Sequence, residues 1–220
     1  MAATEAPQTP PDVGGRSGVD PRELMAVVLL SVTAVFTAWA GFQSSSWSGA
    51  TSIAFNQSSS ARAESAHQEA TADKRQALQV SLFVQWFQAH SLGNARMEDF
   101  IERRFPAPLD AAFDAWIATR PDTNADAPPT PFAMPQYVLP EVAAAEQASQ
   151  RADRLFADGL NASSRADNYT LLTVLYASVL FFAGMSAKVR SRWAQWSLVW
   201  VGSAIFLLAT GFILTLPKLW

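Results

Sequence analysis

Three long stretches of the chain contain no charged side chain: 24–42, 169–187 and 194–217. As helices that rise ~1.5 Å per residue they would be about 28 to 36 Å long, which matches a hydrocarbon core of ~30 Å. Because a backbone in lipid must satisfy its own hydrogen bonds, such stretches are expected to be helical. The pattern predicts an all-α integral membrane protein with three transmembrane helices and a polar domain, 43–168, between the first two.

Helix-forming residues continue past the first apolar stretch. Residues 44–92 are rich in Ala, Gln, Glu and Arg and contain no Pro, and Gly93 followed by Asn94 is a typical helix stop. Pro140 followed by Glu141 suits a helix start, and the Ala-rich residues after it run into the second apolar stretch. The pattern predicts two long helices that form an antiparallel hairpin.

The first of these helices would be much longer than the second, ~75 Å for 43–92 against ~42 Å for 141–168. Either it bends near the serines at 58–60, or a cap is stacked on its overhang. Its middle part, 57–76, is polar almost all round and lacks the pattern of a conventional core helix. Its apolar tip, 78–87, covers more than one face and is expected to be buried on several sides.

The polypeptide between the two long helices predicts a small helical cap. Residues 95–105 and 109–119 have apolar side chains at helical spacing, whereas 120–139 contains five prolines and cannot form a regular element. This last segment carries large apolar and aromatic side chains, so we expect it to lie against the helices. The side chains expected to pack in the cap are Phe100, Ile101, Phe105, Leu109, Phe113, Trp116, Ile117, Phe132, Met134 and Tyr137.

Charge is distributed unevenly along the chain. Residues 43–168 contain ten Lys and Arg against fifteen Asp and Glu, so a nucleic-acid partner is not expected. The positive-inside rule places the basic loop 188–193 in the cytoplasm. The tail 1–23, rich in Pro and Gly and expected to be disordered, is then cytoplasmic as well, and 43–168 lies outside. The basic residues of the loop are Lys188, Arg190 and Arg192.

A second interpretation of the first apolar stretch is a cleaved signal peptide. Ala38-Trp39-Ala40 has the A-x-A outline of a cleavage site. The flank before it is not net basic, however, and Trp is a poor residue at such a site. An uncleaved anchor is therefore expected.

A stripe of small residues recurs every four positions from the first apolar stretch onward. It consists of Thr33, Thr37, Gly41, Ser45 and Gly49. Small residues at this spacing let helix backbones approach closely. The stripe predicts a helix-packing contact, either between protomers or within one chain against another span.

Charged residues on the first long helix are the other candidates for chemistry. Glu64 and His67 have the three-residue spacing with which di-iron bundles hold ligands, but those sites need two such motifs and further Glu residues. No metal or other cofactor is therefore expected. If several copies assembled around a pore, Glu64, His67, Glu69 and Arg75 would line a polar vestibule.

Enzyme signatures are missing from the sequence. The chain contains no Cys, which excludes disulfides and thiol catalysis, and it has no nucleophile elbow, zinc-protease motif or phosphate-binding glycine loop. The three apolar stretches carry no Asp, Glu, Lys, Arg or His, which argues against a proton-coupled transporter.

Several segments resemble a family of uncharacterised bacterial membrane proteins with three predicted transmembrane helices. They are DFIERRF at 99–105, AFDAW at 112–116, APPTPFAMP at 127–135, DNYTLLT at 167–173 and VLFFAG at 179–184. The resemblance implies a protein of the bacterial cytoplasmic (inner) membrane. It implies no activity and transfers no functional residue.

These features predict a non-enzymatic membrane protein that acts as an oligomeric scaffold or accessory subunit through helix–helix contacts. Its expected partners are the lipid bilayer and either further copies of itself or another membrane protein. The alternative is a homo-oligomeric ion channel with the polar vestibule outside the membrane. An extracytoplasmic enzyme or metal-binding protein is the third interpretation.

Overall fold

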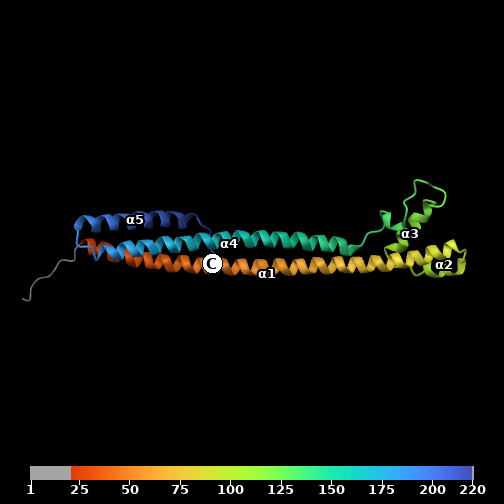
Figure 1. The fold of residues 1–220 in the computed structure, drawn as a ribbon, viewed down its shortest axis with the longest axis horizontal. Helices are drawn as coiled ribbons and strands as arrows, with labels where there is room; N and C mark the ends of the chain where they lie inside the picture. The colour runs from red at the N-terminus through yellow and green to blue at the C-terminus, as the bar shows by residue number, and fades with distance from the viewer. Residues whose placement is uncertain (1–20, 220) are drawn as a thin grey trace, which may run out of the picture. The chain divides into compact units, whose positions relative to one another are not determined.

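The computed structural model of the chain describes residues 21 to 219, and this part is helical without a strand. In chain order (Figure 1) it contains α1 (Pro21–Ser91), α2 (Ala95–Glu102), α3 (Leu109–Ala118), the short 3-10 helix η1 (Pro131–Ala133), α4 (Pro140–Ser186) and α5 (Arg192–Thr215). The predicted all-α class is confirmed. The disordered tail predicted for 1–23 lies outside the described residues, except that its last three residues form the start of α1.

Two compact units are formed by the chain: Met1–Gly49 with Ala162–Trp220, called unit 1 here, and Ala50–Asn161, called unit 2. Unit 2 is slightly shorter at both ends than the domain predicted for 43–168. Gln43 and Trp47, at the start of the predicted domain, are buried and belong to unit 1.

Three helices in the described part are long and apolar enough to cross a membrane, in agreement with the three predicted spans. Where they pack together in unit 1, each contributes one ring to an aromatic contact. The ring centre of Tyr176 on α4 lies 5.7 Å from that of Phe36 on α1 and 5.9 Å from that of Phe206 on α5. Phe36 and Phe206 are 5.5 Å apart with an edge-to-face geometry, which favours the contact.

The residues after α5 are fixed to α1 and α4 by buried polar groups. The Gln43 side chain exchanges two hydrogen bonds of 3.0 Å with the backbone of Leu219, one as donor and one as acceptor. The hydroxyl of Tyr169 donates to the carbonyl of Pro217 at 3.0 Å. Both side chains are fully buried, so each bond satisfies a polar group that would otherwise be costly to bury.

In unit 2, α1 and α4 pack through small side chains. The hydroxyl of Ser58 donates to the carbonyl of Ala152 at 2.8 Å, and that of Ser65 donates to the carbonyl of Ala145 at 3.0 Å. A serine hydroxyl reaches a partner helix's carbonyl only when the two backbones are close. The polar stretch 57–76 therefore does have a packed face, made of Ser58, Ala61, Ser65 and Ala72, all buried.

A glycine creates room for one large ring in this small-residue interface. A Cβ built at Gly159 on α4 would come within 2.6 Å of the Phe55 ring on α1. The Phe55 ring also packs against Phe156, with ring centres 5.4 Å apart. The absence of a side chain at Gly159 thus allows Phe55 to lie between the helices.

The cap is an aromatic cluster seated on the last turns of α1. Its closest ring pair joins Trp86 on α1 and Phe113 on α3, with centres 4.7 Å apart. The proline-rich segment joins the cluster, because Trp116 donates its indole N–H to the carbonyl of Pro128 at 2.7 Å. The buried members are Phe83, Trp86, Ile101, Phe105, Leu109, Phe113 and Trp116, with Leu82, Phe132, Met134 and Tyr137 packed against them.

Since α1 is unbroken from Pro21 to Ser91, the bend considered near the serines does not occur. The cap instead occupies the end of α1, which was the other expectation. Helix α1 stops where predicted, with Gly93 at φ +64° and the Asn94 side chain accepting a hydrogen bond from the Met97 backbone N–H.

The apolar tip of α1 is buried on one face only, so the prediction of burial on several sides is wrong. Phe83 and Trp86 are enclosed by the cap, whereas Leu78 is 68% exposed and Phe87 is 54% exposed. The cap is small and covers only the side of α1 that faces it. For the same reason two residues expected in the cap core remain partly outside it, Phe100 and Ile117.

Gly159→Ala tests the close packing of unit 2. In an open helical position this change stabilises by up to about 1 kcal/mol. Here the new methyl group meets the Phe55 ring, so we expect a destabilisation of about 1–3 kcal/mol in urea unfolding of the full chain, followed by circular dichroism. Phe55→Leu in the same chain should relieve most of the penalty. A stabilising Gly159→Ala would contradict the packing described.

Candidate binding grooves and helix-contact surface

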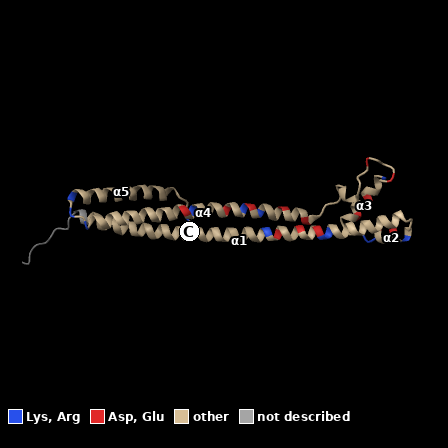
Figure 2. Ribbon diagram, viewed as in Figure 1, with Lys and Arg blue, Asp and Glu red and all other residues tan. Residues whose placement is uncertain are grey.

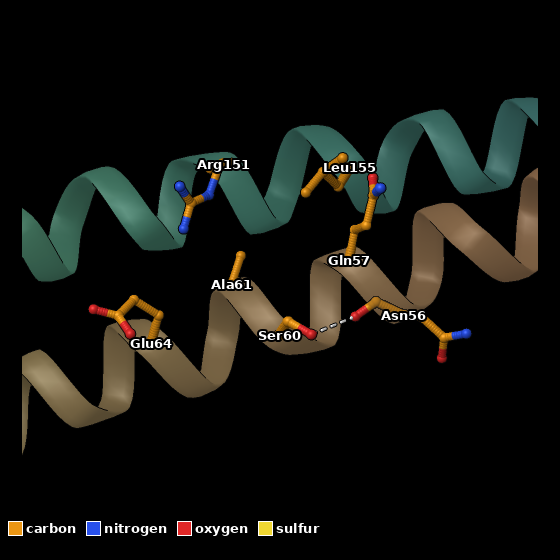
Figure 3. Close-up of a pocket in the computed structure, with 7 residues that line it drawn as sticks. All are labelled: Asn56, Gln57, Ser60, Ala61, Glu64, Arg151 and Leu155. Carbon is orange, nitrogen blue, oxygen red and sulfur yellow. Dashed lines mark hydrogen bonds between the residues drawn. The ribbon is translucent and has the colours of Figure 1, made fainter.

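A polar groove of about 760 Å³ lies between α1 and α4 in unit 2. Figure 3 shows Arg151 extending from α4 toward α1, on the same side of Ala61 as Glu64. The small Ala61 side chain is buried and leaves the groove open above it. The lining residues are Asn56, Gln57, Ser60, Ala61, Glu64, Arg151 and Leu155.

Polar contacts around this groove are mostly within one helix. Glu64 accepts a hydrogen bond of 2.6 Å from Gln68, and the Ser60 hydroxyl donates to the Asn56 carbonyl at 3.0 Å. Between the helices, Arg62 forms an exposed ion pair with Asp153 at 3.6 Å. Exposed pairs of this kind stabilise by about 0–1 kcal/mol, so this one orients side chains more than it holds the helices together.

A second groove, of about 710 Å³, lies where the proline-rich segment returns to α4, also in unit 2. Glu69 and Asp73 line it from α1, Phe132 and Tyr137 from the returning segment, and Glu146 from α4. Sequence reasoning did not predict this groove. The sequence did, however, indicate one wall of the groove, because the aromatic residues of the proline-rich segment predict that this segment lies against the helices.

An ion pair beside this groove joins α1 to the start of α4. Arg75 lies 2.9 Å from one carboxylate oxygen of Glu141 and donates to the other at 3.2 Å. The neighbouring Tyr137 has a buried hydroxyl with no hydrogen-bond partner in the described part of the chain. Burial raises the pKa of Tyr137 above its ordinary value of 10.0, an effect that the positive charge of Arg75 partly offsets.

Within a single chain, the four residues predicted for a polar vestibule are not brought together. Glu64 lines the first groove and Glu69 the second, whereas Arg75 pairs with Glu141. His67 is exposed and lines neither groove. Among residues 21–219 no group of three or more His, Asp and Glu side chains could hold a metal ion.

The stripe of small residues changes its surroundings along α1. Thr33 is fully buried and Thr37 is half-buried, whereas Ser45 and Gly49 are exposed. A Cβ built at Gly41 or at Gly49 would meet nothing within 4 Å. The inner end of the stripe thus packs within the chain, and its outer end is open.

The cause of this change is helical geometry. Each residue turns an α-helix by about 100°, so a step of four residues drifts by about 40° around the axis. Between Thr33 and Gly49 the drift is about 160°, which carries the stripe from the packed side of α1 to the opposite side. A repeat of four residues therefore cannot remain on a single face of a straight helix.

Comparison with known proteins gives no match to a protein family, to a curated protein or to a solved structure. The resemblance to bacterial proteins with three predicted transmembrane helices therefore stays a prediction.

Tyr137→Phe tests the buried hydroxyl near the second groove. Below pH 10 the variant should be about as stable as the original chain, because the hydroxyl has no partner to lose. Above pH 10 the tyrosine of the unfolded chain loses its proton first, since burial raises the pKa in the folded chain. The free energy of unfolding that the protonated Tyr137 hydroxyl contributes is therefore lost as the pH rises from 10.0 through the pKa of Tyr137 in the folded chain.

Urea unfolding at pH 8 and at pH 11 measures this effect. The fall in the unfolding midpoint between the two pH values should be smaller in Tyr137→Phe than in the original chain. Phe87→Leu serves as the control, because Phe87 is an exposed ring on α1 in unit 2 that cannot titrate, so this variant should show the same fall as the original chain. An equal fall in the original chain and in Tyr137→Phe would contradict a raised pKa at this position.

Proposed function

We propose that the chain is a non-enzymatic integral membrane protein that acts as an oligomeric scaffold or accessory subunit through helix–helix contacts. The observation that carries this proposal is the open outer end of the small-residue stripe, at Gly41, Ser45 and Gly49. Among the residues that the structure describes, none would come within 4 Å of a Cβ at Gly41 or Gly49, so a second helix can approach the α1 backbone there. Close approach at glycine is a common basis of helix association in membranes.

The apolar surface of unit 1 supports insertion into a bilayer. On α1, Val35 is 67% exposed and Phe42 is 58% exposed, and on α5 Leu208 is 75% exposed. Side chains of this kind on the outside of three long apolar helices suit contact with lipid rather than water. The spans then carry no Asp, Glu, Lys, Arg or His, which supports a structural role over ion or proton transport.

Orientation follows in this proposal from the basic loop between α4 and α5. With Lys188, Arg190 and Arg192 in the cytoplasm, α1 begins on the cytoplasmic side of a bacterial inner membrane. Residues 43–168 then form an antiparallel helical hairpin with its aromatic cap outside the membrane. In Figure 2 basic residues (blue) lie where α5 begins, and acidic residues (red) are frequent in unit 2.

The assembly can be weighed directly in native lipid. Gentle extraction should give a complex whose mass is a multiple of 23.9 kDa, or one that contains this chain and another membrane protein. We expect Gly49→Leu and Gly41→Leu to dissociate the complex, because the larger side chain separates the helix backbones. The matched control is Gly211→Leu, an open and exposed glycine on α5 that should leave the mass unchanged.

Two results would contradict the proposal. Extraction of the chain only as a monomer, without a second protein, would contradict a role as an oligomeric scaffold or accessory subunit. A complex that tolerates both glycine changes on α1 is held together by another surface than the stripe.

A further inference from the structure

An apolar groove of about 350 Å³ lies between α1 and α5 in unit 1. It is lined on α1 by Leu24, Val28 and Val32 and on α5 by Val199, Ser203 and Phe206, among others. Val199 is 5% exposed and lies at its base, whereas Leu24 and Val28 are more than half exposed at its rim. The groove is thus a narrow apolar channel that is open along one side.

The loop that precedes α5 has the opposite chemistry. Lys188, Arg190 and Arg192 are exposed, and no ion pair involves them among the described residues. The sequence contains no Asp or Glu after Asp167. Trp193, beside the last of the three, is 82% exposed, which is typical of a ring at the level of lipid headgroups.

The loop and the groove meet at the start of α5. Met25 of α1 and Gln195, Trp196 and Val199 of α5 line a small recess between them, and Met25 and Val199 also belong to the groove. From Arg192, the first residue of α5, to Val199 the helix rises only about 10 Å. A positive surface therefore continues into an apolar channel over roughly two helical turns.

One class of molecule carries both chemistries at this spacing. We infer that an anionic phospholipid binds here, with its phosphate headgroup at Lys188, Arg190 and Arg192 and one acyl chain in the groove between α1 and α5. Basic pockets between transmembrane helices on the cytoplasmic side suit such headgroups. A zwitterionic lipid has the same acyl chain but gains little from three positive charges.

Bound lipid would complete the packing of α5. At its far end α5 is fixed by the hydrogen bonds of Gln43 and Tyr169. At its near end the N-cap residue, Ser191, makes no side-chain capping bond. An acyl chain in the groove would contact both α1 and α5 near the start of α5, where the hydrogen bonds of Gln43 and Tyr169 do not reach. This inference rests on the membrane insertion proposed above.

Native mass spectrometry can test the site. The full chain is delipidated in detergent and offered equal amounts of phosphatidylglycerol and phosphatidylcholine with the same acyl chains. We expect one phosphatidylglycerol to be retained per chain and phosphatidylcholine to be washed away. Replacing Lys188, Arg190 and Arg192 by Gln should lower the affinity by roughly fivefold for each charge removed.

Variants that fill the groove test its acyl-chain part. Val28→Trp on α1, or Ser203→Phe on α5, should release the lipid while the basic loop stays intact. Two such variants are used because one alone could perturb folding, which circular dichroism detects. The matched control is Leu208→Trp, on the exposed side of α5 and outside the groove, which should retain the lipid.

Several results would overturn the inference. Equal retention of the two lipids, or retention by the variant without the three charges, would show that the headgroup is not recognised. Retention by folded groove-filling variants would show that the acyl chain lies elsewhere. A dimer that Val28→Trp or Ser203→Phe dissociates would show that a second copy fills the groove. A chain that partitions into buffer without detergent would contradict membrane insertion itself, and so the proposed function as well.

Discussion

The close approach of α1 and α4 is the constraint on which unit 2 depends. Along α4 the buried and half-buried positions that face α1 alternate between steps of three and four, which keeps them on one face of the helix, and they are almost all small. Ser58 and Ser65 reach carbonyl oxygens of α4 only because no large side chain separates the backbones. Many short contacts replace the large buried side chains of an ordinary core. On α4 in unit 2 the buried positions are Ala145, Ala148, Ala152 and Gly159, and the half-buried one is Leu155.

The same alternation continues on α4 into unit 1, but its residues become large. Tyr169, Leu172, Tyr176 and Val179 are all fully buried there. In unit 1 aromatic rings fill the space between three helices, whereas in unit 2 the two helices admit the Phe55 ring only where Gly159 lacks a side chain. Helix α4 can pack in both units because the spacing of its buried positions stays the same along the helix, and only the size of the buried side chains changes.

Much of this architecture could be predicted from the sequence, because long apolar stretches, proline positions and the Gly93-Asn94 stop act locally. The packed face of 57–76 could not be predicted, because Ala and Ser do not produce a clear hydrophobic pattern. These residues become a packing surface only when the backbone of a partner helix lies close to them. The exposed tip of α1 was mispredicted for a related reason. Apolar residues such as Leu78 and Phe87 indicate burial on average, but the cap is too small to cover them. The grooves combine residues from α1 and α4, so Glu64 and Glu69 could be named in advance but not assigned to separate grooves.

The small-residue stripe shows how a correct observation can lead to two incomplete interpretations. The sequence presents a contact within the chain and a contact with another protomer as alternatives, yet a spacing of four residues leads from a packed side of α1 to an open side. The buried line of α1 keeps its face by mixing steps of three and four, as at Ala40, Gln43 and Trp47. The stripe leaves that line because it takes only steps of four. Its two ends can therefore have different roles: Thr33 contributes to packing inside unit 1, and Gly49 leaves the helix backbone open to another helix.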